Sequence, residues 1–185
     1  MDKYQISNVK TFEFTKIIGL ENIEFGKYII IDDFVLIYAK ERIKIGNYIH
    51  IASFTSISGG GELVMEDFSG FSSGCRIVTG TDDFKEWGFG NPTIASEFRN
   101  IKTGKIHIGK FAVIGSNSVI LPDVVIGEGV TVAAGSVVSK DLEPWGIYVG
   151  NRKVGTRNKD EVLKNYERFL AQSEENRIGT LFQQK

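Results

Sequence analysis

The chain has 185 residues, which suits one ordinary domain or one domain with a short appendage. Its 22 Lys and Arg residues nearly balance 23 Asp and Glu residues, so neither nucleic acid nor an anionic membrane is expected as the main partner. The first residues carry no apolar signal segment and no later stretch approaches bilayer-spanning length, so we expect a cytoplasmic protein without membrane contact.

In chain order, the first strong signal is a large apolar residue at every sixth position. The early ladder runs through Phe25, Ile31, Ile37, Ile45, Ile51, Ile57, Met65, Phe71 and Ile77. Two longer steps, from 37 to 45 and from 57 to 65, recur at the same point of each turn. The pattern therefore predicts coils of three short strands plus a two-residue excursion, which makes a triangular solenoid.

Residues next to the ladder predict how each coil turns. Glycine often follows a ladder residue, as at Gly46 and Gly109, and we interpret these glycines as corners that need positive φ. Residues two positions before the ladder are aliphatic or small and should point inward, because strand side chains alternate. The single cysteine, Cys75, belongs to this inward class and is expected to be a core thiol rather than a nucleophile.

A gap in the ladder between Ile77 and Ile108 predicts a loop, at about residues 79–104, that leaves the solenoid. Asp82, Asp83 and Trp87 stand in this segment. Loops of such length in compact domains are usually functional or disordered, and we expect a loop on the substrate side.

The ladder then resumes and ends before a change of character. It runs through Ile108, Ile114, Ile120, Ile126, Val132 and Val138. Beyond about Thr156, apolar residues fall at helical spacing among charged ones. We therefore expect a solenoid domain over 1–155, and over 156–185 an amphipathic helix with a tail, packed on the solenoid or a neighbouring subunit and capping one end.

The hexad, of the form aliphatic-Gly-x-x-small-x, is clearest in IGSNSVILPDVVIGEGVTVAAGSVV at residues 114–138. It resembles the hexapeptide-repeat acyltransferases over about residues 17–150. The resemblance implies an all-β fold, a left-handed parallel β-helix, with the projecting loop and the C-terminal α-helix as additions. It also implies a homotrimer with active sites between subunits.

Five further stretches narrow the resemblance: IDDF (31–34), IGNYIHIASFTSISGGG (45–61), TDDF (81–84), NPTI (91–94) and GIYVGNRKVG (146–155). Together they look like bacterial sugar N-acyltransferases that act on dTDP-4-amino-4,6-dideoxyglucose in O-antigen or surface-glycan synthesis. Such an enzyme would use acetyl-CoA, or a similar short acyl-CoA, as its co-substrate.

His50 is the candidate catalytic residue, as the general base that accepts a proton from the attacking amine. It should point outward beside Gly70 in the next coil, and a contact between subunits is the alternative. His107 falls in another column, where we expect no chemical role. Asp32 and Asp33, near His50 at a corner, either bind the sugar or are solvated turn residues.

Other candidates bind the substrates. Asp82 and Asp83 would contact the sugar nucleotide. Around the later coils, the residues expected to accommodate the pantetheine arm and phosphates of CoA are Ser116, Ala133, Ala134, Lys140, Arg152 and Lys153, with Arg157 in the same basic cluster. A solvated basic face is the alternative for the charged members.

Three other functions remain to be weighed against N-acyl transfer. A sugar O-acetyltransferase would use the same scaffold, and a non-catalytic binding module is possible because fold does not fix function. A zinc hydratase would need three imidazoles around the metal, whereas the chain has two histidines in different columns, so no metal is expected.

Overall fold

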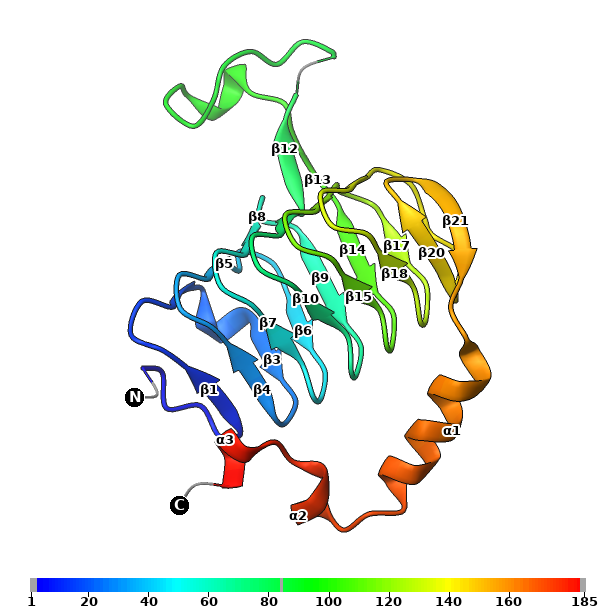
Figure 1. The fold of residues 1–185 in the computed structure, drawn as a ribbon. Helices are drawn as coiled ribbons and strands as arrows, with labels where there is room; N and C mark the ends of the chain where they lie inside the picture. Colours follow the sequence, from blue (N-terminus) through cyan, green and yellow to red (C-terminus); the bar gives the residue numbers. More distant parts are fainter. Residues whose placement is uncertain (1–2, 84, 184–185) are drawn as a thin grey trace.

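A computed structural model describes residues 3–83 and 85–183. These residues wind into a β-solenoid in which successive coils add strands to three sheets (Figure 1). Sheet A contains β1 (Val9–Thr11), β4 (Ile29–Ile31), β7 (His50–Ile51), β10 (Gly70–Phe71), β15 (Val113–Ile114), β18 (Thr131–Val132), β20 (Gly146–Val149) and the antiparallel β21 (Arg152–Thr156). Sheet B contains β2 (Lys16–Ile18), β5 (Leu36–Tyr38), β8 (Ser56–Ser58), β11 (Arg76–Val78), β16 (Val119–Ile120) and β19 (Val137–Val138). Sheet C contains β3 (Ile23–Phe25), β6 (Ile43–Ile45), β9 (Glu62–Met65), β14 (Lys105–Ile108) and β17 (Val125–Ile126), and the short helix η1 (Leu20–Asn22) precedes β3. The predicted triangular solenoid is confirmed.

The six-residue ladder forms the core of the prism. From Ile31 to Val138 every ladder residue is buried, and Cys75 is fully buried among them as expected. Full burial of such a side chain stabilises the fold by about 1.5–3 kcal/mol. The repeat thus sets both the sheet register and the core.

The expectation that the glycines after ladder residues adopt positive φ is wrong. At Gly109, whose φ is not positive, an added Cβ would lie 2.7 Å from the backbone nitrogen of Glu128. Glycine is needed there because adjacent coils approach closely. Positive φ falls two residues later, and in several coils that position holds an aromatic residue, such as Tyr48 (φ 57°) or Phe111 (φ 62°).

These aromatic residues form a column at the corner between sheets C and A, the aromatic corner, made by Tyr28, Tyr48, Phe68, Phe111 and Trp145. Successive ring centroids lie 5.1, 4.8, 5.5 and 6.4 Å apart. Aromatic pairs of this kind contribute roughly 0.5–1.5 kcal/mol each, which offsets part of the roughly 1–3 kcal/mol of strain that a left-handed backbone costs at a residue other than glycine.

A second column of rings marks the corner between sheets A and B. Phe14, Phe34 and Phe54 stack with centroids 5.2 and 5.1 Å apart, and we call them the phenyl corner. Each ring is more than half exposed, at 56%, 53% and 59%. In an isolated subunit, these rings form an apolar ridge that is exposed to solvent.

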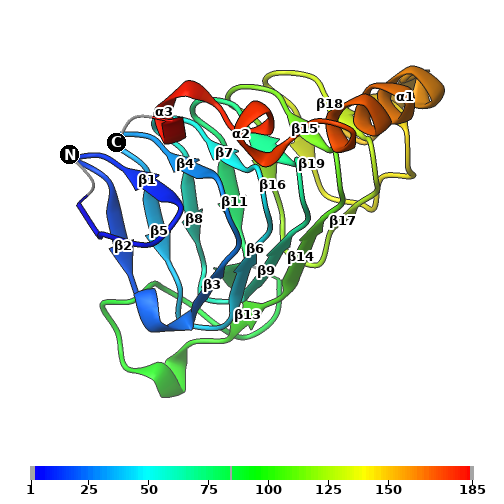
Figure 2. The ribbon, with the colours of Figure 1, turned by 90° about the horizontal axis from the view of Figure 1, so that it is seen from below.

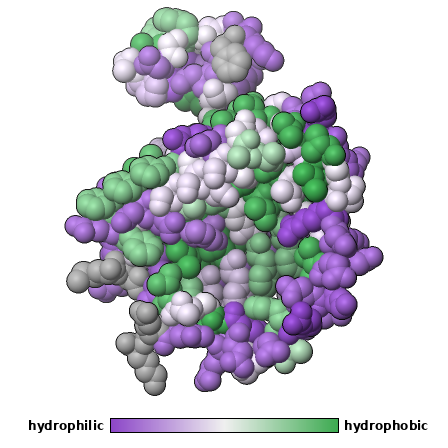
Figure 3. Space-filling view, in the orientation of Figure 1, coloured by the Kyte–Doolittle hydropathy of each residue, from purple (hydrophilic) through white to green (hydrophobic). Residues whose placement is uncertain are grey.

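The loop leaves the third corner, between sheets B and C, on a two-stranded stem. Strand β12 (Gly80–Asp82) pairs antiparallel with β13 (Ile101–Thr103), and the Gly104 N–H donates to the Thr79 carbonyl at 2.8 Å. The short helix η2 (Ser96–Phe98) lies in the tip. The loop projects from the solenoid between β11 and β14 (Figures 1 and 3). Residue 84 and the last two residues of the tail lie outside the described residues.

The C-terminal segment corrects the expectation of an end cap. Helix α1 (Lys159–Leu170) begins after Asn158, whose side chain accepts a hydrogen bond from the Glu161 N–H. It packs along the aromatic corner, where the Tyr166 and Phe169 rings meet Phe68 edge-on at 5.4 and 5.3 Å. The amphipathic helix is confirmed, but it covers the side of the solenoid (Figure 2).

After α1, the chain returns to the first coils through α2 (Glu174–Arg177) and α3 (Thr180–Gln183). The Tyr28 hydroxyl donates to the Glu174 carboxylate, and this hydrogen bond raises the pKa of Tyr28 to about 12. The Phe182 ring meets Tyr28 edge-on at 5.6 Å. Residues 158–183 therefore form a strap along the solenoid. Throughout residues 3–83 and 85–183, every helix is too short or too polar to cross a membrane.

Candidate active site

A groove on the outer side of sheet A holds the catalytic candidate. Its volume is about 480 Å³, and it runs from the aromatic corner toward the corner between sheets A and B. Its floor includes His50, Gly70 and Val113, which are register neighbours on β7, β10 and β15. The predicted column is confirmed, and because Gly70 has no side chain it leaves space beside the imidazole.

His50 is paired with an acid. Its Nε2 lies 3.0 Å from Oδ2 of Asp32, in the preceding coil, and the imidazole remains 55% exposed. The Ser53 hydroxyl reaches the same carboxylate oxygen at 3.5 Å. When Nε2–H donates to Asp32, the lone pair is on Nδ1, which is then the nitrogen that can accept a proton.

Three serines line the other end of the groove. Ser72 and Ser73 occupy the corner one coil from Ala52, and Ser116 lies one coil further. None of the three hydroxyls donates a hydrogen bond to another described residue, so they are available to a ligand. Of these, only Ser116 was predicted. The ladder could have revealed the others, because Ser72 and Ser73 follow Phe71 as Asp32 and Asp33 follow Ile31.

Asp33, although it adjoins Asp32, is occupied by the backbone. Its Oδ1 accepts the Phe14 N–H at 2.8 Å, which ties the corner to the preceding coil. This contact favours the interpretation of Asp33 as a turn residue.

The two loop aspartates lie at the opposite corner from the groove and organise the loop. Asp82 accepts two hydrogen bonds from Arg99, at 3.0 and 2.7 Å. Asp83 accepts the Lys85 N–H, and this bond, with others from the loop backbone and the Asn100 side chain, holds the pKa of its carboxyl well below the usual range. Within one chain, neither carboxylate lines the groove that contains His50.

Asp82 does line a second cavity, at the base of the loop. This cavity has a volume of about 350 Å³, and Tyr38 and Lys40 contribute to it together with Thr81 and Arg99. A mixture of aromatic and cationic side chains suits a polar, phosphorylated ligand. The predicted role of Asp82 in substrate binding thus has a cavity beside it.

The candidates for CoA binding lie around the later coils. Ser116 is joined to the next corner, which holds Ala133 and Ala134, because its carbonyl accepts the Gly135 N–H at 2.8 Å. Lys140 and Arg152 are neighbours of Ser139 and Asn151, which hydrogen-bond each other at 2.9 and 2.8 Å.

Two basic residues have other contacts. Lys153 lies 3.8 Å from Glu143. Arg157 donates instead to the Phe111 and Gly129 carbonyls at the aromatic corner, and the expectation that it joins the basic cluster is wrong.

The histidines do not build a metal centre. His50 lies on sheet A and His107 on sheet C, where His107 pairs with Glu66 at 2.9 Å. Across the described part of the chain, no three His, Cys, Asp or Glu side chains gather as a metal site would require.

Comparison with known proteins shows which family this chain resembles. The family model for the bacterial transferase hexapeptide, with six repeats, matches residues 105–140. The dTDP-4-amino-4,6-dideoxy-D-glucose acyltransferase of Escherichia coli is 38% identical over 144 residues, which covers 77% of this chain and 75% of that protein.

Solved structures of AntD, an N-acyltransferase from Bacillus cereus, are also similar. The complex with dTDP and 3-hydroxybutyryl-CoA superposes with a TM-score of 0.82 at 38% identity, covering 88% of this chain and 87% of that one. A mutant of AntD with dTDP-4-amino-4,6-dideoxyglucose and coenzyme A also gives 0.82, at 36% identity and with 90% and 89% coverage.

Proposed function

The chain belongs to the family of the dTDP-4-amino-4,6-dideoxy-D-glucose acyltransferase, within the hexapeptide-repeat transferases, and on that premise we propose that it acylates the amine of this same nucleotide sugar. The acyl donor is a short acyl-CoA, acetyl-CoA in the first instance. The observation that carries the proposal is the Asp32–His50 pair in an open groove lined by serines.

The proposed reaction is direct attack of the amine on the thioester carbonyl. As the C–N bond forms, the amine loses a proton, and Nδ1 of His50 is the group in the groove that can accept it. Asp32 holds the imidazole and stabilises the imidazolium that results. The C–S bond then breaks, and the thiolate leaves with a proton as free CoA.

The serine end of the groove suits the acyl group. Hydroxyls of Ser72, Ser73 and Ser116 can donate hydrogen bonds to the oxygen that becomes negative during attack. From Ser116, the corner of Ala133 and Ala134 continues toward Lys140, Arg152 and Lys153, which can bind the phosphates of CoA.

A homotrimer is part of this proposal. The exposed phenyl corner adjoins Leu36 of sheet B, which is 39% exposed, and Val137, at the other end of the same sheet, is 54% exposed; a subunit interface along sheet B would cover them. In a trimer, the loop of one subunit can approach the groove of the next. Asp82 and Asp83 would then contact the sugar nucleotide from a neighbouring chain.

The product would be a dTDP-activated acylamino sugar, the kind of donor that a glycosyltransferase consumes. Use in O-antigen or another surface glycan is consistent with that chemistry.

The decisive assay follows free thiol as the protein is incubated with an acyl-CoA and dTDP-4-amino-4,6-dideoxyglucose. Acetyl-CoA and 3-hydroxybutyryl-CoA are compared as donors, and dTDP-glucose, which has a hydroxyl in place of the amine and a second hydroxyl at C6, is the control acceptor. We expect thiol release with the amino sugar only. Equal release with dTDP-glucose would support O-acylation, and release with neither would support a binding module.

A further inference from the structure

The floor of the groove that contains His50 lacks one side chain. Along sheet A, His50, Gly70 and Val113 are register neighbours on successive strands, and all three line the groove. Neighbouring strands lie about 4.8 Å apart, so the imidazole and the Val113 side chain stand on strands separated by roughly twice that distance. The bare glycine leaves a gap between these two side chains, which we call the Gly70 notch.

Turn geometry does not require glycine at position 70. The φ angle of Gly70 is not positive, and its register neighbours in the same column carry side chains. A Cβ added to Gly70 would lie 3.0 Å from the His50 carbonyl oxygen, and the next two atoms, at 3.9 and 4.0 Å, also belong to the His50 backbone. The side chains of the chain neighbours Ser69 and Phe71 are buried. Among the described residues, therefore, no side chain fills the notch.

The notch is apolar between two polar ends. Val113, which is 41% exposed, forms one wall, and the Gly70 N–H is already bonded to the Ala112 carbonyl at 3.1 Å. The Asp32–His50 pair lies on one side, and the three serines of the groove lie at the corner. Sugar hydroxyls placed over Gly70 would lose hydrogen bonds to water without replacing them, whereas an aliphatic chain would lose none.

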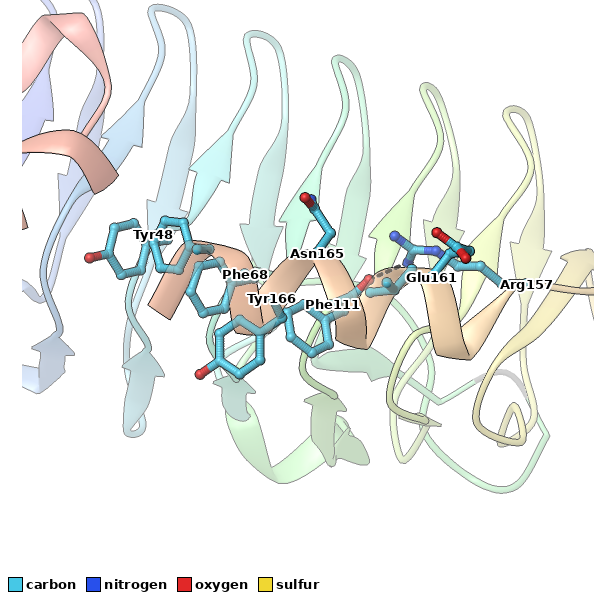
Figure 4. A pocket seen from close by; sticks show the side chains of 9 residues that line it. Tyr48, Phe68, Phe111, Arg157, Glu161, Asn165 and Tyr166 are labelled. Atoms are coloured by element: carbon cyan, nitrogen blue, oxygen red, sulfur yellow. Dashed lines mark hydrogen bonds between the residues drawn. The ribbon is translucent and has the colours of Figure 1, made fainter. Parts of the chain in front are cut away.

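The notch also lies where the acyl end of the donor would arrive. In the proposed function, CoA runs along the later coils past Ser116, which follows Val113 by three residues in the same coil. The thioester therefore enters the groove from the Val113 side. At its other end the groove reaches the Phe68 ring, which Tyr166 of α1 meets edge-on at 5.4 Å (Figure 4). Phe68 precedes Gly70 by two residues, or about 7 Å along a strand, so the space for an acyl chain is short.

We propose that the Gly70 notch holds the acyl chain of the donor, and that Gly70 and Val113 determine which acyl chains are transferred, an inference that rests on the proposed function. The notch accepts a short, unbranched aliphatic chain that extends beyond the acetyl methyl group. A four-carbon acyl group is then transferred as readily as acetyl, because its added methylenes leave water for an apolar wall.

Donor selectivity of the whole protein tests this assignment. Thiol release gives kcat/KM for acetyl-CoA, butyryl-CoA and hexanoyl-CoA with dTDP-4-amino-4,6-dideoxyglucose as acceptor, and we expect comparable values for the first two donors. Gly70→Ala puts a methyl group into the notch and should lower the butyryl-to-acetyl ratio about tenfold, the effect of one methylene in an apolar pocket. Val113→Ala widens the notch and should raise the hexanoyl-to-butyryl ratio by about as much.

Two further variants complete the design. Val113→Leu narrows the notch from the opposite wall without adding a Cβ beside the His50 carbonyl, and it should lower the butyryl-to-acetyl ratio even if Gly70→Ala does not fold. Val125→Ala makes the same change as Val113→Ala at a residue of similar exposure, 47%, on sheet C. It is the matched control and should leave every ratio unchanged. A ratio of two donors on one variant cancels any general loss of activity, so a displaced His50 would not imitate the effect.

Three results would overturn the assignment while leaving acyl transfer intact. The first is acetyl transfer without butyryl transfer by the unmodified protein, and the second is unchanged donor ratios in the Gly70 and Val113 variants. The third is a rise in KM for the sugar nucleotide that is equal with both donors, which would assign the notch to the sugar. Absence of thiol release with every acyl-CoA would instead overturn the proposed function.

Discussion

A carboxylate beside an imidazole determines which ring nitrogen a substrate meets. In this chain Asp32 contacts Nε2 of His50, so Nδ1 is the nitrogen left to accept a proton in the proposed reaction. The pair joins two coils, because β4 and β7 are neighbours in sheet A. The geometry of a single side chain therefore depends on the register of the whole solenoid.

We expect His50→Ala to lower kcat on the order of 10²-fold, because a general base is lost, with little change in acyl-CoA affinity. Asp32→Asn should lower kcat as well, since the positioning carboxylate no longer holds the imidazole in place. Ser56→Ala, on β8 of sheet B and outside the groove, is the control. Full activity of His50→Ala at every pH would mean that the amine loses its proton without this residue.

Cys75 should resist thiol reagents in the folded protein. Burial raises the pKa of its thiol, so the reactive thiolate is scarce at neutral and mildly alkaline pH. Because the pKa of Cys75 is higher in the folded than in the unfolded chain, the neutral thiol contributes fully to the free energy of unfolding below the ordinary thiol pKa. This contribution is lost as pH rises through the higher pKa of the folded state. Reaction with a chromogenic disulfide at pH 8 should be slow natively and fast in denaturant; rapid native labelling would contradict the burial.

At the scale of elements, the loop is separable from the core. Its stem ends at the Asp82–Ile101 pair, and β11 and β14 on either side keep the ladder in step. Loop closure depends weakly on length, so replacing residues 83–100 by a short Gly-Ser bridge should leave a folded solenoid.

That deletion should keep acyl-CoA binding while raising KM for the sugar nucleotide. Circular dichroism and steady-state kinetics check the two parts. An unfolded variant would show that the loop belongs to the fold, and unchanged KM and kcat would show that it takes no part in binding.

Strands could be predicted where apolar residues recur at a fixed spacing for a single physical reason, burial in the core. The ladder predicted the strand columns, the core and the point where the loop leaves. This was possible because apolar residues that recur every six positions are all buried together only when the chain winds into coils of three strands. The aromatic corner was not predicted. Tyr48 and Phe68 do not belong to the six-residue ladder, and they adopt positive φ, a backbone conformation that normally favours glycine. The Asp83 contacts depend on how the loop folds, which no period encodes.

At the scale of the molecule, the phenyl corner should lie in a subunit interface. We expect a trimeric mass by light scattering at micromolar concentration, and dissociation on Phe34→Glu, because a charge would then be buried against apolar rings. Val154→Glu, at a position of similar exposure on β21, is the matched control. A monomeric unmodified protein would contradict the proposed trimer.

The path of the C-terminal segment was the least predictable feature. Spacing of Val162, Tyr166 and Phe169 indicates that one helix face is covered, but not by which surface. That surface is the aromatic corner, which Tyr166 and Phe169 contact through Phe68. Because the aromatic corner was not predicted, the surface that the helix covers could not be predicted either.

The strap gives this solenoid an order of assembly. Contacts between neighbouring coils join residues about 20 positions apart, so early coils can form while the chain is still emerging from a ribosome. The hydrogen bond between Tyr28 and Glu174 joins residues 146 positions apart and must wait for nearly the whole chain. Until the strap forms, the rings of the aromatic corner are exposed. A nascent chain therefore presents an aggregation-prone aromatic surface that residues 158–183 later cover.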